Sequence, residues 1–168
     1  MNKFINPTEI ELKEETVIAI NKISKATTGG RRMRFNSIVC VGDGKCHVGI
    51  GFGKANDVAM AVSKAKEKAK KRIIKVPILK GTIAHRIDIK HGSVRLMLKP
   101  AGPGTGIIAG GPVREVLSQL GIKNILSKNT GSTNAINVVK ALEHGLLSLK
   151  DPLMIAKQRG ISVKQLFT

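Results

Sequence analysis

The sequence contains no tryptophan and no tyrosine, and it has only four phenylalanines. Acidic residues are also scarce, because 11 aspartates and glutamates stand against 29 lysines and arginines, for a formal net charge of +18. The first shortage means that a core must be built from aliphatic side chains. The second means that the folded chain repels itself unless a polyanion neutralises it. We expect nucleic acid to be that polyanion, and an anionic membrane surface is the alternative.

Long apolar runs are missing. No stretch of the sequence approaches the roughly 18 apolar residues of a membrane-spanning helix, and residues 1–8 lack the apolar segment of a signal peptide. We therefore expect a cytoplasmic protein with no membrane partner. Apolar residues still make up 42% of the 168 positions, which is enough for one medium domain or two small ones.

Cysteine occurs only twice, at positions 40 and 46. Cytoplasmic thiols stay reduced, so we expect no disulfide. Together with His47 they could supply three metal ligands. However, alternation along a strand would send Cys46 and His47 to opposite faces, and structural zinc sites use four ligands. The sequence therefore predicts two small, half-buried thiols, no metal site and no cofactor.

A recognisable catalytic arrangement is lacking too. The glycines from Gly49 to Gly53 match neither a P-loop nor a dinucleotide-binding fingerprint. The glycine-rich segment Gly102–Gly106 precedes a predicted helix and could bind phosphate at the helix N-terminus, as in small-molecule kinases of a similar two-layer fold. A kinase also needs carboxylates for magnesium and for a base, and the second half has none in a paired motif. We expect no enzyme; a phosphotransferase with a basic surface is the alternative.

What the chain does have is a basic, glycine-broken segment from Lys25 to Arg34. Its glycines, Gly29 and Gly30, let a backbone approach a phosphate, and arginines supply bidentate contacts. A flexible, solvated turn is the alternative. Because three of the four positions from 31 to 34 are arginine, we interpret the segment as a nucleic-acid-binding loop.

This loop belongs to a predicted β-hairpin. Residues 35–41 and 45–52 are strand-like, and the Asp43-Gly44 pair between them is the preferred two-residue turn, in which both positions take positive φ. Residues 16–25 form a further strand, although a helix would also fit part of that segment. Glycine at every second position from 49 to 53 admits a close partner on one strand face, either a helix or an RNA backbone.

A helix is predicted from an Asn56 cap to about Arg72. Its expected apolar stripe is Val58, Val62, Ala65 and Ala69. Five lysines occupy the rest of its circumference, where they are either solvated or in contact with RNA. Upstream, the acidic segment Glu9–Glu15 shields a sheet edge or touches a basic neighbour.

The second half begins after a hinge at residues 75–81. Its expected strands are 82–90, 93–99 and 124–128. The first predicted helix of this half carries an apolar stripe and ends at Gly121. The second predicted helix is capped by Asn134 and directs Val138, Ala141, Leu142 and Leu149 inward. That first stripe consists of Val113, Val116, Leu117 and Leu120. The order is β-β-β-α followed by β-β-α-β-α, which predicts an α+β protein of two two-layer α/β sandwiches.

Several long motifs together carry a resemblance to a known family. They include S-K-x-x-x-G-G-R-R at residues 24–32, V-G-D-G-x-x-H-V-G-x-G-x-G-K-A at 41–55, G-T-G-I-I-A-G-G at 104–111 and G-S-T-N-x-I-N-V-V at 131–139. On these residues the chain resembles the fifth protein of the bacterial small ribosomal subunit, the S-five family. The resemblance covers nearly the whole chain from about Leu12. Ala84 and Cys46 depart from the family pattern.

The resemblance implies a double-stranded-RNA-binding-like first domain and a second domain of the S-five type. The implied domain ranges are an arm at 1–10, the two domains at 11–75 and 76–150, and a tail at 151–168. It also implies binding to small-subunit ribosomal RNA, a role in subunit assembly, and a position at the messenger entrance beside the fourth and eighth small-subunit proteins. Influence on translational accuracy and on the spectinomycin response follows from the same resemblance. No homo-oligomer is expected.

Two sets of site residues follow. The predicted RNA-binding residues are Lys22, Lys25, Thr28, Gly29, Gly30, Arg31, Arg32, Arg34, Phe35, Lys45 and Lys54. The second glycine loop, residues 99–112, has low polarity and contains two adjacent isoleucines, so we expect it to face a protein more than a phosphate. The predicted protein-interface residues are Gly104, Gly106 and Arg114.

Overall fold

The computed structural model describes residues 4–5, 12 and 15–166. Its longer elements follow the predicted order. The first half contains β2 (Thr16–Thr27), β3 (Gly30–Gly42), β4 (His47–Ala55) and α1 (Val58–Lys71). The second half contains β8 (Ile87–His91), β9 (Val94–Pro100), α2 (Gly111–Leu120), β11 (Ile125–Gly131) and α3 (Ala135–Ser148).

Short elements complete the chain. They are β1 (Phe4–Ile5), β5 (Ile73–Lys75), β6 (Ile78–Leu79), β7 (Thr82–Ile83), β10 (Ile107–Ile108), α4 (Pro152–Arg159) and α5 (Val163–Leu166). The expected single strand over 82–90 is wrong, because residues 82–83 pair with β6 and only β8 joins the main sheet. Among the described residues no helix is long and apolar enough to cross a membrane.

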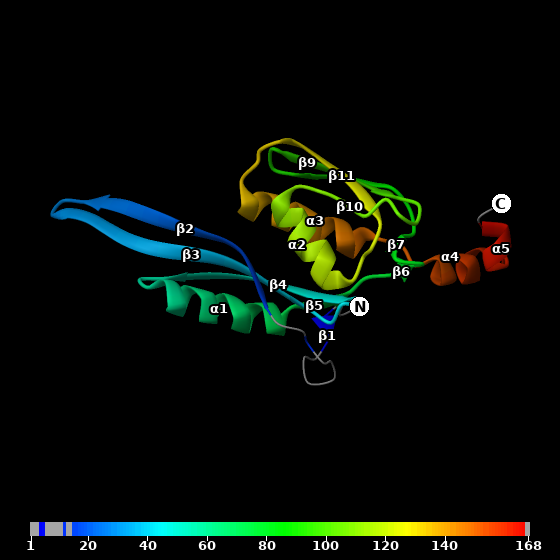
Figure 1. The fold of residues 1–168 in the computed structure, drawn as a ribbon, viewed down its shortest axis with the longest axis horizontal. Coiled ribbons are helices and arrows are strands. Elements are labelled where there is room, and N and C mark those ends of the chain that lie inside the picture. The colour runs from blue at the N-terminus through cyan, green and yellow to red at the C-terminus, as the bar shows by residue number, and fades with distance from the viewer. Residues whose placement is uncertain (1–3, 6–11, 13–14, 167–168) are drawn as a thin grey trace.

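Two sheets and two helix layers alternate (Figure 1). The first sheet has the order β1-β5-β4-β3-β2, and the second has the order β10-β11-β9-β8. Helix α1 covers the outer face of the first sheet, while α2 and α3 lie between the two sheets. Each half is therefore a two-layer α/β sandwich, as predicted, and the helices of the second half pack against both sheets.

The glycines of β4 explain how α1 reaches the first sheet. A Cβ atom at Gly49, Gly51 or Gly53 would collide with a backbone carbonyl of α1. The close partner of this strand face is thus the helix. Its buried stripe is Ala61, Ala65 and Ala69, whereas the predicted members Val58 and Val62 are only half-buried. The reason is steric, because only the smallest side chains let the two backbones approach this closely.

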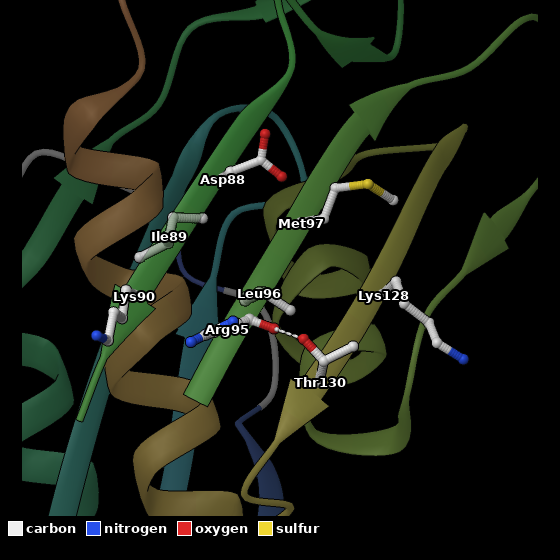
Figure 2. Close-up of a pocket in the computed structure, with 8 residues that line it drawn as sticks. All are labelled: Asp88, Ile89, Lys90, Arg95, Leu96, Met97, Lys128 and Thr130. Atoms are coloured by element: carbon white, nitrogen blue, oxygen red, sulfur yellow. Dashed lines mark hydrogen bonds between the residues drawn. The ribbon is translucent and has the colours of Figure 1, made fainter. Parts of the chain in front are cut away.

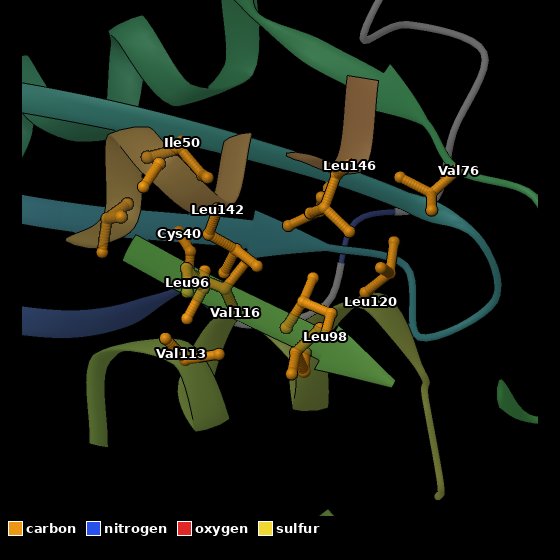
Figure 3. Close-up of a cluster of buried hydrophobic side chains, with 14 of the residues drawn as sticks. Cys40, Ile50, Val76, Leu96, Leu98, Val113, Val116, Leu120, Leu142 and Leu146 are labelled. Atoms are coloured by element: carbon orange, nitrogen blue, oxygen red, sulfur yellow. The ribbon is translucent and has the colours of Figure 1, made fainter. Parts of the chain in front are cut away.

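One aliphatic core joins the halves (Figure 3). Cys40 and Ile50 of the first sheet lie in the same cluster as Leu96 and Leu98 of β9. The helix stripes predicted around Val113 and Val138 are buried, Gly121 ends α2 in the left-handed conformation, and the Asn134 side chain caps α3 by accepting from the Ile136 amide. By contrast, Asp57 and not Asn56 is the N-cap residue of α1, and no side chain caps that helix.

The hinge segment takes part in this core. Val76 is fully buried, and its amide donates to the Cys46 carbonyl at 2.9 Å. Ahead of α1, the Glu15 carboxylate forms an ion pair with Lys66, and this hydrogen bond is the largest cause that lowers the pKa of Glu15. The acidic segment therefore touches a basic neighbour at Glu15, while Glu9, Glu11 and Glu14 lie outside the described residues.

Candidate nucleic-acid interface

The basic segment is a β-hairpin arm, not a loop. Strands β2 and β3 pair continuously out to Thr27 and Gly30, which leaves only Thr28 and Gly29 as the turn. The Thr27 hydroxyl donates to the Gly30 carbonyl at 3.0 Å, and Gly30 adopts a φ of +136°. The sequence prediction of a loop was wrong because ladder hydrogen bonds between the two strands hold these basic residues extended. Figure 1 shows the arm, defined here as residues 21–35, projecting beyond the body.

Pairing sorts the arm's cations onto two faces. Directly opposed residues of antiparallel strands lie on the same face, and the register opposes Lys25 to Arg32 and Ile23 to Arg34. Lys54 joins this face, because it pairs with Asn36, two residues beyond Arg34. These four cations line a hollow of about 410 Å³.

The other predicted RNA-binding residues lie in three separate places. Lys22, Arg31 and Phe35 lie on the opposite face of the arm, since Lys22 pairs with Phe35 and Arg31 pairs with Ala26. Thr28, Gly29 and Gly30 form or flank the exposed tip, where a Cβ on either glycine would meet no described atom within 4 Å. Lys45 is exposed but lies beyond the far end of β3, so the structure does not bring it together with the arm.

The turn that follows the far end of β3 differs from the predicted two-residue Asp43-Gly44 turn. Gly44 has a φ of +70°, but Asp43 does not take positive φ. Instead the Asp43 carboxylate accepts hydrogen bonds from the amides of Lys45, Cys46 and His47 at 2.7–3.0 Å and contacts the His47 ring at 2.6 Å. A side-chain-capped four-residue connection thus replaces the expected two-residue turn.

The same carboxylate controls the electrostatics of the turn. Burial alone would raise the pKa of Asp43, but hydrogen bonds from the His47 ring and from three backbone amides outweigh burial, and the pKa is held well below its ordinary value. Cys46 lies in the turn and not in β4, so its Sγ lies 3.4 Å from His47 Nδ1. The expectation that these two side chains diverge was wrong. Asp43, Cys46 and His47 have ligand atoms within 4.8 Å of one another, yet the Asp43 oxygens already serve the turn.

The glycine-rich segment Gly102–Gly106 does not sit at a helix N-terminus. Strand β10 separates it from α2, whose N-cap is Gly110. Gly106 instead fixes a local turn, because its amide donates to Asn124 Oδ1 at 3.1 Å and its carbonyl accepts from the Ile125 amide at 3.0 Å. The arrangement needed for the phosphate alternative is therefore not present.

The predicted protein-interface residues are accessible to different degrees. Gly104 is exposed with a φ of +90°, Gly106 is half-buried with a φ of +73°, and Arg114 is exposed near the start of α2. Ile108 is 51% exposed and lines, with Arg114, a hollow of about 440 Å³. Arginine is enriched at protein interfaces, and here it shares a hollow with an exposed apolar side chain.

A second basic surface lies on the outer face of the second sheet (Figure 2). Lys90, Arg95 and Thr130 form one row across three strands, and Asp88, Met97 and Lys128 form the next. They line a hollow of about 310 Å³. Asp88 is held in a two-point ion pair by Arg86. The mixture of charges makes this face less cationic than the arm.

Comparisons with known proteins point to one family. The family model described as "Ribosomal protein S5, N-terminal domain" matches residues 13–77, and the model described as "Ribosomal protein S5, C-terminal domain" matches residues 89–159. A small ribosomal subunit protein uS5 of Bacteroides thetaiotaomicron is 46% identical over 159 residues, covering 95% of this chain and 92% of the relative. A protein of the same name from Dehalococcoides mccartyi is 47% identical over 161 residues, covering 96% and 93%.

Proposed function

The chain belongs to the ribosomal protein S5 family, and we propose that its basic hairpin arm holds small-subunit ribosomal RNA. As a member of this family the chain is a structural constituent of the small ribosomal subunit, located on the ribosome in the cytoplasm, and not an enzyme.

One observation carries the RNA assignment. The arm brings Lys25, Arg32 and Arg34 to one face, where they line one hollow together with Lys54 of β4. Among the described residues no acidic side chain lines that hollow. Three cations on a projecting ribbon and a fourth at its base suit a phosphate backbone, because arginine donates to phosphate in a forked geometry and lysine adds charge. The position of the arm beyond the body leaves both of its faces accessible to RNA.

The test separates the two faces of the arm. Arg32→Ala together with Arg34→Ala should weaken binding to small-subunit ribosomal RNA. It should also reduce the slope of log affinity against log salt by about 1.5, since each lost phosphate contact removes about 0.7–0.9. Lys22→Ala together with Arg31→Ala, on the opposite face, removes the same charge and is the matched control, which should change the slope less. An unchanged slope in the double variant would remove this face from the RNA interface.

The second glycine loop is the proposed protein-facing surface. We propose that this loop contacts the fourth protein of the small subunit, beside the messenger entrance. Through that contact the loop would contribute to subunit assembly and to translational accuracy. The eighth small-subunit protein is the other expected neighbour of the chain. Gly106→Arg and Arg114→Leu should leave RNA binding by the arm intact and raise misreading in a cellular reporter. Wild-type error rates with normally assembled subunits would count against this surface.

The spectinomycin response is assigned to the arm and is tested by drug sensitivity of the Arg32→Ala strain.

The domain division is also a proposal. We place the boundary between 11–75 and 76–150, which is supported by the change from the first sheet at β5 to the second sheet at β8. Lys80 offers an exposed site within the connecting segment, at a φ of +48°. Limited trypsin digestion of the free protein should cut in the connecting segment at residues 75–81, after Lys80, or in the N-terminal arm at 1–10, before it cuts elsewhere in either half.

A further inference from the structure

Strand β4 has an open edge in the middle of the molecule. On one side it pairs with β3 from Val48 to Ala55, but on the other side β5 covers only residues 47–49. Within the described residues no strand pairs with positions 50–55 on that side. Alternate backbone amides along such an edge point outward, where they can donate to an incoming acceptor.

Residues 50–54 of this strand line a groove of about 500 Å³, together with Asn36 of β3 and Ile136 of α3. Four cations line the groove: Lys54, Lys68, Arg72 and Lys140. Gly51 and Gly53 contribute indirectly, because their missing side chains let α1 pack against β4 at backbone distance. That close packing brings Lys68 and Arg72, near the end of α1, to the strand edge. Among the described residues no acidic side chain lines the groove.

The opposite wall comes from the other half of the chain. Lys140 of α3 lies over the ring of Phe52 of β4, with its Nζ 5.7 Å from the ring centroid. This cation–π contact holds a lysine of the second half at the edge of the first sheet. The groove therefore exists only when both halves are packed together. It also adjoins the hollow on the arm, because Lys54 lines both.

We propose that the groove along β4 binds the phosphate backbone of RNA, so that one RNA segment runs from the arm across Lys54 to Lys68 and Lys140. This inference rests on the proposed RNA-binding function of the arm and adds a second contact region that includes the other half. The positive charge of the groove favours RNA over a protein strand as its occupant. A protein strand could pair with the open edge, but it would need acidic side chains to neutralise Lys54, Lys68 and Lys140, whereas RNA brings one negative charge with every phosphate.

Neutral variants test the groove in the full-length chain. Lys68→Gln combined with Lys140→Gln should weaken binding to small-subunit ribosomal RNA about tenfold at low salt and reduce the salt slope by about 1.5. The control is Lys64→Gln combined with Lys123→Gln. It removes the same charge from the same two halves, at exposed lysines that do not line the groove. Both pairs should keep a melting temperature close to that of wild type, because all four lysines are exposed and Lys140→Gln removes only a single cation–π contact with Phe52.

Lysine labelling gives a second measurement that does not depend on any variant. An amine-reactive reagent followed by mass spectrometry should show Lys54, Lys68 and Lys140 protected by ribosomal RNA, with Lys64 and Lys123 unprotected. Equal effects of the groove pair and the control pair would overturn the groove. Protection that appears only in the assembled subunit, and not with RNA alone, would assign the edge to a neighbouring protein and would also overturn the proposal.

The result also distinguishes the groove from the arm. If Arg32→Ala with Arg34→Ala lowers the salt slope while the groove pair does not, the arm keeps its function and the groove is refuted. If neither pair changes the slope, both the proposed RNA interface of the arm and its extension along β4 are refuted.

Discussion

The two ends of β3 are both glycine-containing turns, but their surroundings are opposite. At the outer end, Gly29 and Gly30 have open space where a side chain would be, and the flanking cations face solvent. At the inner end, a Cβ on Gly42 would collide with the backbone of Gln119 in α2, and the Gly44 amide donates to the Gln119 carbonyl at 3.0 Å. The two ends of one strand thus separate the proposed RNA-binding surface from a structural joint.

Glycine therefore has a different structural role at each end of β3. At the tip it permits the two-residue turn that keeps arm cations in register. At the inner turn it permits contact between backbones of the two halves, and Gly121 repeats the device, because a Cβ there would collide with Gly44. A change at the tip should therefore affect RNA binding, and a change at the inner turn should affect stability.

The largest expected effect comes from one added methyl group at the inner turn. Gly42→Ala would place a Cβ against the Gln119 carbonyl and should lower the free energy of unfolding by about 3 kcal/mol. Gly29→Ala adds the same methyl at the tip and should change it by less than about 0.5 kcal/mol. Urea unfolding of both variants measures the contrast. Equal losses would show that the inner turn is not a joint.

A smaller effect is expected from the capping carboxylate. Asp43→Asn should cost about 2 kcal/mol at neutral pH, because a buried acceptor loses its charge. The folded pKa of Asp43 lies below its unfolded value, so this stability is present above the unfolded pKa and is lost as pH falls through the folded one. The gap between wild type and variant should therefore close in acid. Asp88→Asn, at an exposed ion pair, is the control, and a gap that is constant with pH would contradict the assignment.

Backbone strain at the inner turn should have a smaller cost again. Gly44→Ala forces a φ of +70° on an L-residue and should lower the free energy of unfolding by about 1 kcal/mol. Gly92→Ala, at the exposed β8–β9 turn with a φ of +57° and open surroundings, imposes the same strain elsewhere. Thermal unfolding of the two variants should agree within error. A neutral Gly44→Ala variant would mean that this turn relaxes freely.

The smallest effect concerns thiol reactivity and leaves stability unchanged. Burial raises the pKa of Cys40 to about 12, and burial followed by the charge of Asp43 raises the pKa of the half-buried Cys46 as well. A maleimide should label Cys46 slowly in the folded protein and Cys40 only after unfolding. Cys46→Ser should therefore abolish native labelling, and native labelling of Cys40 would show that the joint opens.

Sequence reasoning succeeded where local patterns decide the outcome. Apolar spacing predicted the stripes of α2 and α3, and single residues predicted caps at Asn134 and Gly121. It failed where two local solutions compete. Asp43-Gly44 suits a two-residue turn, but the Asp43 side chain satisfies three backbone amides and lengthens the connection. The sequence predicts a loop at residues 25–34 because the glycines there are typical of loops, whereas the pairing of β2 with β3 cannot be read from the sequence.

The sequence by itself determined the positive charge, the order of the main strands and helices, and the basic character of the segment at 25–34, because each follows from composition or from short-range spacing. Only the tertiary structure decided which cations share a face and which lysine of α3 reaches the edge of β4. Strand register sorts Arg31 from Arg32 and Arg34, and helix packing brings Lys140 to Phe52 from 88 positions away (140 minus 52). Such contacts depend on ladder hydrogen bonds and on a core shared by both halves, and neither leaves a local signature in the sequence.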